Sequence, residues 1–167
     1  MKKWFALSFV SLFILVSCNK KKDDTECPYK ISSIVAPAME QEALKDSLDA
    51  HGIQAIKDPA GFYYKINKAG TDPKPKDLCS AIAAYYTLTY FNGVIIQSTQ
   101  SGAPAVFQLS NVITGWQKAL LLVGQNADID IYIPPSLAYG PDDYTAGNTT
   151  IPGNSYLVFH VVVAQVQ

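Results

Sequence analysis

The stretch FQLSNVITGWQKALLLVG, residues 107–124, carries the strongest structural signal in this chain. A strand-like run ends in Val112 and Ile113, and the chain then turns directly into a helix that opens with Trp116. The first N–H groups of a helix lack an intrahelical acceptor, and the indole is the largest apolar side chain available. The stretch therefore predicts a wide, flat apolar surface at the start of this helix.

The helix also shows a start signal and one apolar face. Thr114, followed three residues later by Gln117, has the form of a capping box, and Gly124 is able to end the helix. The apolar residues recur at i, i+3, i+4 and i+7 and form one stripe: Trp116, Ala119, Leu120 and Val123.

Strand-like segments surround this helix. Asn92 and Gly93 separate two of them and form a strong hairpin signal. The segments are residues 61–66, 83–91, 94–96, 128–133 and 156–166. Together these features predict an α+β domain, a curved antiparallel β-sheet wrapped around one short α-helix.

The N-terminus has the form of an export signal. Lys2 and Lys3 precede an apolar run that is too short to span a bilayer comfortably, so residues 1–17 are predicted to be a signal peptide. The small residue Ser17 directly before Cys18 resembles a bacterial lipobox, which implies lipidation of Cys18. An ordinary secretory signal with an incidental cysteine is the alternative.

The next two segments connect this signal to the domain. Residues 18–30 start with the charged run NKKKDDTE after the cysteine and are predicted to be a solvated tether. Residues 31–60 are predicted to be an N-terminal helical extension, with Leu44 and Leu48 one turn apart and Gly52 at a left-handed cap. This helix either packs on the domain of residues 61–167 or forms a dimer contact.

Charge and ligand spacing exclude two classes of function. The formal net charge of −1 argues against nucleic-acid binding, which relies on a clustered basic surface. Neither His51 nor His160 has a close Cys or His partner in the sequence, so no metal site is predicted. His160 lies in a valine-rich strand and is interpreted as a surface residue of that strand.

Two further cysteines lie beyond the signal. In an exported chain, Cys27 and Cys79 are expected to form one disulfide that links the N-terminal segment to the start of the domain. Two free thiols are the alternative.

Four motifs stand in a characteristic order along the chain. They are a Tyr-rich strand with an Asn-Gly hairpin, VITGW opening a helix, IPPSLAYG after an isoleucine-rich strand, and IPGNSYLVF before the last strand. This order resembles the FKBP family of peptidyl-prolyl cis-trans isomerases, over about residues 62–166. The chain resembles exported bacterial lipoprotein forms of the family. The resemblance implies activity on X-Pro bonds, without a cofactor.

The resemblance also implies the roles of individual residues. Trp116 corresponds to the floor of the pocket that receives the proline ring. The Ile113 amide and the Tyr139 hydroxyl correspond to the groups that hydrogen-bond the bound ligand. The remaining residues implied to bind substrate are Tyr86, Ile96, Gln97, Val112, Ile151 and Phe159.

The residues themselves fit such a reaction. Rotation about an X-Pro bond breaks no covalent bond, so it needs neither a nucleophile nor a titrating base. The chain shows no serine, cysteine or histidine in the order of a catalytic triad.

The chain departs from the family pattern around the pocket. Ile96 and Gln97 stand where active members usually have phenylalanine and aspartate, which removes a ring and a carboxylate. Ala105 stands where many members have a second pocket aromatic, and Tyr144 lies in a lengthened loop that could line or cover the site. These changes predict reduced activity.

Three functions follow as hypotheses. The first is a lipid-anchored isomerase that acts on exported proteins in the bacterial cell envelope, on the periplasmic or surface face of the outer membrane. The second is a catalytically weak or inactive proline-binding chaperone. The third is a structural lipoprotein that uses the helix around Leu44. The expected partners are proline-containing polypeptides, macrolide ligands of the family and the membrane, reached through the lipid anchor.

Overall fold

A computed structural model describes residues 26–99, 102–147 and 149–167 of the chain. The predicted signal peptide, the lipidation site at Cys18 and most of the predicted tether lie outside the described residues. No helix of the described part is long and apolar enough to cross a membrane.

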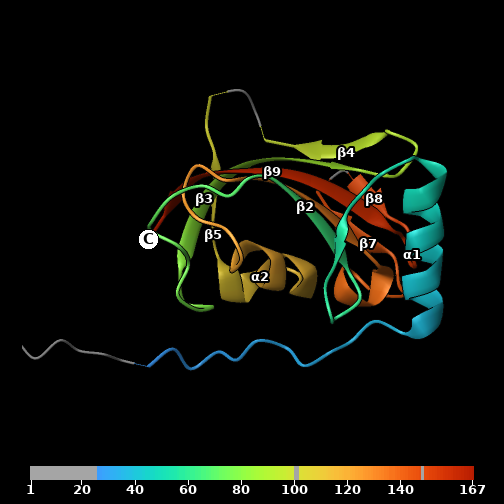
Figure 1. Cartoon of the computed structure of the whole chain (residues 1–167), viewed down its shortest axis with the longest axis horizontal. Coiled ribbons are helices and arrows are strands. Elements are labelled where there is room, and N and C mark those ends of the chain that lie inside the picture. Colours follow the sequence, from blue (N-terminus) through green and yellow to red (C-terminus); the bar gives the residue numbers. More distant parts are fainter. Residues whose placement is uncertain (1–25, 100–101, 148) are drawn as a thin grey trace, which may run out of the picture.

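One antiparallel sheet dominates the molecule and curves over the short helix α2 (Thr114–Leu120) (Figure 1). Its strand order is β1-β2-β6-β9-β3-β4, and β5 also pairs with β3. The strands are β1 (Ile56–Lys57), β2 (Tyr63–Lys68), β3 (Ala81–Thr89), β4 (Ile95–Ser98), β5 (Ala105–Gln108), β6 (Asp128–Ile133) and β9 (Leu157–Val166). This arrangement confirms the predicted α+β fold.

Short elements complete the loops around α2. A separate two-stranded sheet pairs β7 with β8. These elements are the 3-10 turns η1 (Leu109–Asn111) and η2 (Pro135–Leu137) and the strands β7 (Tyr144–Ala146) and β8 (Thr149–Ile151).

Apolar side chains alternate along the strands and point toward α2, where they form the core. In β6, Ile129, Ile131 and Ile133 are all fully buried, while Asp128 and Asp130, on the opposite face of the strand, are only partly buried. A strand points successive side chains to opposite faces, so this pattern gives the sheet one apolar face. The stripe predicted for the helix is buried against that face: Trp116, Ala119, Leu120 and Val123.

The start of α2 differs from the prediction. Thr114 is the first residue of the helix, Ile113 is its N-cap, and no side-chain cap hydrogen bond is made, so the predicted capping box is wrong. Gln117 instead donates from Nε2 to the Val112 carbonyl oxygen at 2.9 Å. The amide thereby holds the loop before the helix.

The end of α2 also differs from the prediction. The helix ends at Leu120, and Gly124 lies beyond it. A Cβ atom on Gly124 would lie 2.0 Å from the Thr71 carbonyl oxygen. Glycine is therefore needed there for a close backbone approach.

The N-terminal helix α1 (Ala38–Ala50) covers one end of the outer face of the sheet (Figure 1). Leu44 and Leu48 are buried with Tyr63 and Tyr132 of the sheet, so the helix packs on its own domain. Gly52 has a φ of +65° directly after the helix, as predicted. The short strand β1, which pairs with β2, was not predicted and lies inside the segment assigned to the extension.

An extended arm, residues 26–37, precedes α1 and is fastened at three points. Cys27 and Cys79 form a disulfide, as predicted, rather than remaining free thiols. Lys118 of α2 donates from Nζ to the Ser32 carbonyl oxygen at 2.7 Å, and the Ala36 N–H donates to Ala60 O at 2.8 Å.

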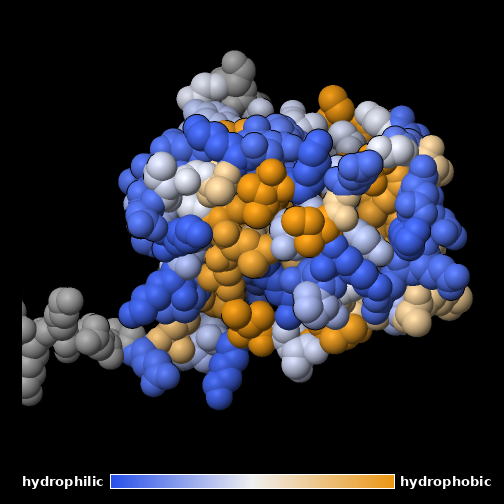
Figure 2. All heavy atoms as spheres, in the orientation of Figure 1, coloured by the Kyte–Doolittle hydropathy of each residue, from blue (hydrophilic) through white to orange (hydrophobic). Residues whose placement is uncertain are grey.

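Hydrophobic side chains gather over α2 and the arm in Figure 2. A shallow apolar groove between the two elements is lined by residues that include Ile31, Ile34, Val35, Leu121 and Leu122.

Candidate active site

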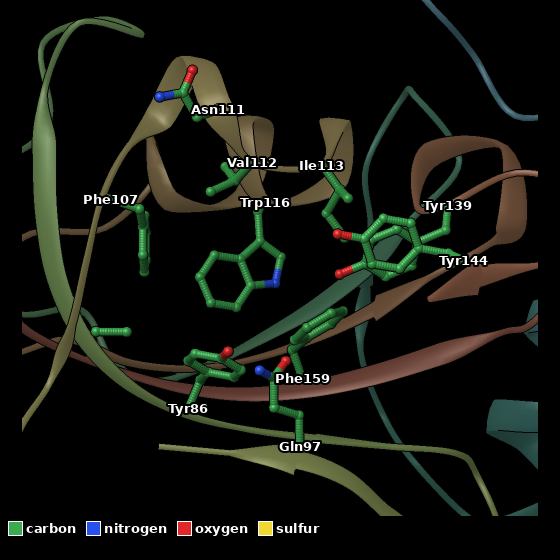
Figure 3. A pocket seen from close by; sticks show the side chains of 11 residues that line it. Tyr86, Gln97, Phe107, Asn111, Val112, Ile113, Trp116, Tyr139, Tyr144 and Phe159 are labelled. Atoms are coloured by element: carbon green, nitrogen blue, oxygen red, sulfur yellow. The ribbon is translucent and has the colours of Figure 1, made fainter. Parts of the chain in front are cut away.

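A cavity of about 200 Å³ opens between α2, the sheet and the loop after η2 (Figure 3). It is lined by Tyr86, Gln97, Ala105, Phe107, Asn111, Val112, Ile113, Trp116, Tyr139, Tyr144 and Phe159. None of these eleven side chains is ionised at neutral pH.

Three aromatic rings meet the indole of Trp116 at the base of this cavity. The ring centroids of Tyr86, Phe107 and Phe159 lie 5.3, 5.2 and 5.1 Å from that of Trp116, each in an edge arrangement. Edge-to-face contacts at this distance are favourable for aromatic pairs. Trp116 is only 4% exposed. Its position is therefore fixed by packing before any ligand binds.

Tyr139 and Tyr144 form the opposite wall of the cavity (Figure 3). Their rings are stacked, with centroids 4.1 Å apart and an interplanar angle of 14°. Burial, with smaller contributions from Tyr144 and Tyr86, raises the pKa of Tyr139 to about 12. The hydroxyl of Tyr139 is therefore protonated at neutral pH and can donate a hydrogen bond.

Two further donors at the cavity have no acceptor within the described residues. The buried indole Nε1 of Trp116 has no hydrogen-bond partner there. The backbone N–H of Ile113, the N-cap of α2, donates to no acceptor among the same residues. A buried donor without a partner costs free energy, so the site favours a ligand that offers acceptors.

The structure brings together most of the side chains predicted for the site. Seven of the nine line the cavity: Tyr86, Gln97, Val112, Ile113, Trp116, Tyr139 and Phe159. Ile96 and Ile151 line a neighbouring cavity of about 170 Å³ instead. The two cavities share Gln97, Tyr139 and Tyr144 and so adjoin each other.

Gln97 makes no hydrogen bond through its carboxamide to any described residue, although it lies at the edge of both cavities. The Tyr86 hydroxyl likewise has no protein partner in the described part of the chain. Burial raises the pKa of Tyr86 above its ordinary value. Neither the Gln97 carboxamide nor the Tyr86 hydroxyl is therefore paired within the described residues.

Two further residues of the cavity, Phe107 and Asn111, were not predicted from the sequence. Phe107 stands two residues after Ala105 in β5, and both line the cavity. Residues two apart in a strand point to the same face of the sheet. Because Ala105 was assigned to the pocket, this rule could have identified Phe107 as a pocket residue. Asn111 lies in η1, where no periodic pattern identifies it.

His160 lies on the outer face of the sheet, away from the cavity. Its Nδ1 lies 2.8 Å from Oδ1 of Asp130, and Asn67 donates from Nδ2 to both Asp128 and Asp130. The predicted surface position of His160 is confirmed. The three strands β2, β6 and β9 bring these residues together, although they are far apart in the sequence. The absence of a metal site stays a prediction.

The lining defines what the cavity can do. Its base is flat, aromatic and largely buried, and its wall carries hydroxyl and amide donors. Among the described residues, no nucleophile paired with a base lines it, because this lining contains no serine, cysteine, histidine or carboxylate. The arrangement suits binding and orienting a small apolar ring flanked by carbonyl groups.

Comparisons with known proteins agree with this architecture. Residues 70–164 match the model of the family described as FKBP-type peptidyl-prolyl cis-trans isomerase. An outer membrane protein MIP of Legionella longbeachae is 37% identical over 110 residues, which make up 65% of this chain and 46% of that protein. An FKBP-type isomerase, FkpA of Aeromonas hydrophila, is 31% identical over 128 residues, or 76% of this chain and 45% of that protein.

A solved structure has the same fold. The crystal structure of FkpA from Escherichia coli superposes with a TM-score of 0.65 at 30% identity, covering 78% of this chain and 60% of that chain. This chain spans about half the length of the curated relatives it matches. The family match covers more than half of the chain, and the chain therefore belongs to the FKBP-type peptidyl-prolyl cis-trans isomerase family.

Proposed function

We propose that this protein catalyses cis-trans isomerisation of X-Pro bonds in exported polypeptides. The observation that carries the proposal is the buried Trp116 ring, held by three aromatic edges at the base of a cavity with free donors. The proline ring of the substrate is placed against the indole. Val112 and Phe159 provide apolar sides for it.

The reaction requires rotation about a partial double bond, which takes about 10 to 100 s without a catalyst, against a barrier near 20 kcal/mol. The twisted amide loses resonance and with it part of the charge separation between oxygen and nitrogen. An apolar cavity therefore disfavours the planar amide relative to the twisted one. Each 1.4 kcal/mol or so of this preference raises the rate about tenfold.

Two donors orient the substrate during this rotation. The Ile113 amide donates to one ligand carbonyl, and the protonated Tyr139 hydroxyl donates to another. Both groups lack a protein acceptor among the described residues, so neither has to give up a protein hydrogen bond to bind. Ile96 and Ile151 contact the part of the substrate that enters the neighbouring cavity.

A catalytically weak proline-binding chaperone is the second candidate. The specific observation in its favour is Gln97. Within the described residues, its carboxamide makes no hydrogen bond to a hydroxyl group of the site. A neutral amide also lacks the charge that strengthens a hydrogen bond to an acidic partner. Binding of proline-containing segments would persist in this case while acceleration is lost.

The N-terminal sequence supports a proposal for the cellular setting. We place the protein in the bacterial cell envelope, with residues 1–17 removed and Cys18 carrying a lipid that holds the domain on a membrane. One relative is named as an outer membrane protein. Unfolded exported chains are the substrates available there, and macrolide ligands of the family are expected to compete with them for the cavity.

The test measures cis-to-trans exchange of a short X-Pro peptide by NMR, with the chain from Cys18 onward, in which Trp116 is the sole tryptophan, purified in detergent. Trp116→Ala removes the floor of the cavity, and Trp116→Phe retains a flat ring as its matched control. Circular dichroism establishes that both variants are folded. We expect acceleration by the unmodified chain, loss of it in Trp116→Ala and partial retention in Trp116→Phe.

The outcomes separate the two candidates. Acceleration that a macrolide ligand abolishes supports the enzyme. Ligand-dependent quenching of Trp116 fluorescence without acceleration supports the binding module. Absence of both effects in a folded protein rejects the proposed function and its alternative together.

A further inference from the structure

We infer that Tyr144 is a further substrate-contacting residue, whose hydroxyl acts beside that of Tyr139 as a second donor to the substrate carbonyl. This inference rests on the proposed function. Tyr144 was expected from its loop to line or cover the site, but no hydrogen-bonding role follows from its position in the sequence.

The two tyrosines present their hydroxyls to the same space. Their rings are stacked with centroids 4.1 Å apart. Both hydroxyl oxygens lie on the side of the stack that faces Trp116 in Figure 3. Both residues line the cavity that has Trp116 at its base. A group seated against the indole therefore meets a pair of phenols.

Neither of the two phenol hydroxyls is hydrogen-bonded to a described residue of the protein. Within the described residues, the hydroxyls of Tyr139 and Tyr144 make no hydrogen bond, either to each other or to another group. Tyr144 is 43% exposed, so a ligand can reach it. A carbonyl oxygen has two lone pairs and can accept from two hydroxyls at once. The stack thus matches one carbonyl group of a peptide.

The loop around Tyr144 holds the residue in place. The hydroxyl oxygens of Thr145 and Thr150 lie 3.0 Å apart across the β7–β8 pair, and Asp143 accepts from the Gly153 N–H at 2.9 Å. A Cβ atom on Gly153 would lie 1.9 Å from the Pro141 carbonyl oxygen, so the loop closes tightly. The donor is therefore positioned before the substrate arrives, which lowers the cost of binding.

The position of the stack indicates which carbonyl is bound. Tyr139, Tyr144 and Gln97 form the boundary between the two cavities. A peptide with its proline against Trp116 and a neighbouring apolar side chain against Ile96 and Ile151 crosses this boundary. The peptide group between those two side chains then lies beside the two hydroxyls.

The experiment is a double-mutant cycle on the chain from Cys18 onward, with Tyr139→Phe, Tyr144→Phe and the double variant. Each substitution keeps the ring and its stacking and removes only the hydroxyl. Tyr85→Phe is the matched control, because Tyr85 is exposed and precedes the cavity residue Tyr86 in β3, where successive side chains point to opposite faces. NMR exchange of an X-Pro peptide gives kcat/KM, and Trp116 fluorescence gives the peptide Kd.

We expect each single variant to lose about two- to tenfold in kcat/KM, the range of one neutral hydrogen bond. The double variant should lose more than the product of the two singles, because each hydroxyl can partly replace the other on a shared carbonyl. A purely structural role of Tyr144 would not produce this coupling. Tyr85→Phe should leave both kcat/KM and Kd unchanged.

An unchanged kcat/KM in Tyr144→Phe, alone and combined with Tyr139→Phe, overturns the inference and leaves the proposed function intact. If the unmodified chain binds the peptide without accelerating exchange, the same cycle is read from the Kd values, and coupling there supports the second donor. A chain that neither binds nor accelerates rejects the proposed function and the inference with it.

Discussion

Trp116 keeps its orientation through contacts with three rings that come from β3, β5 and β9. A ring supported on three edges cannot turn without displacing the core around it. The donors around the ring belong to Ile113 and Tyr139, whose hydroxyl has a pKa raised to about 12. Specificity and orientation at this site therefore come from neutral groups.

Isomerase activity should be independent of pH between about pH 6 and about 9. Burial raises the pKa of Tyr139, so its donating, protonated form persists up to a pH of about 12, well above this window. No carboxylate, imidazole or amine from the described part of the chain lines the cavity. The check is kcat/KM for an X-Pro peptide across this range, at constant ionic strength. A sigmoidal or bell-shaped profile would contradict a mechanism without a titrating group.

Replacing Gln97 by aspartate should increase kcat/KM about fivefold. A carboxylate can accept from the unpartnered Tyr86 hydroxyl, and one added hydrogen bond contributes about 1 kcal/mol, which is about fivefold in rate. Gln97→Ala is the control and should change little, because the amide makes no hydrogen bond to described residues. Peptide exchange by NMR measures both variants. A decrease of kcat/KM in Gln97→Asp would show that the absence of a carboxylate at this position does not limit activity.

The helix α2 is placed by close packing at its first turn. Gly115 lies against Ile133 of β6, where a Cβ atom would lie 2.7 Å from Cδ1 of that side chain. The small residue thus allows the helix start, and with it Trp116, to approach the sheet. The loop before the helix is held by Gln117 rather than by a side-chain cap.

Gly115→Ala should destabilise the fold by about 1–3 kcal/mol, the usual cost of overpacking, despite the better helix propensity of alanine. Thr114→Ala is the matched neighbour and should cost less than about 0.5 kcal/mol, because Thr114 makes no cap hydrogen bond. Urea unfolding of both variants measures these differences. A loss of about 1 kcal/mol in Thr114→Ala would instead restore the capping role.

The N-terminal arm and α1 are built into the body of the protein. Leu44 is fully buried against the outer face of the sheet, and the Ser136 N–H of η2 donates to Glu40 of α1 at 2.9 Å. The disulfide Cys27–Cys79 fastens the arm to the loop before β3. A tether that starts at Cys18 would therefore pull on a folded unit and not on a loose segment.

Removing the disulfide with Cys27→Ser and Cys79→Ser should lower the free energy of unfolding by about 4 kcal/mol at most. The bond joins residues 52 apart, and chain entropy predicts this value for a loop of that length. Urea unfolding of the variant and of the unmodified chain, each with and without reductant, provides the measurement. Reductant should lower the free energy of unfolding of the unmodified chain and leave that of the variant unchanged. Equal stability of the two proteins without reductant would mean that α1 and the arm are held by packing alone.

Features that depend on neighbours in the chain were predicted from the residues. The apolar stripe from Trp116 to Val123, the Asn92-Gly93 hairpin and the alternation in residues 128–133 all appear in the structure. These signals are local because a helix or a strand repeats within a few residues. The seven cavity residues were identified differently, because their expected roles come from the resemblance of the motifs to the family, and the structure places their side chains around one cavity.

Features that depend on the pairing of distant segments could not be predicted in this way. The third ring of Phe107 on Trp116, the stack of Tyr139 on Tyr144 and the division of the site into two cavities arise where β5, α2 and the β7–β8 pair meet. The docking of α1 on Tyr63 and Tyr132 is of the same kind. A residue's periodicity gives the face it occupies, whereas the packing of whole elements in three dimensions selects the residue that it meets.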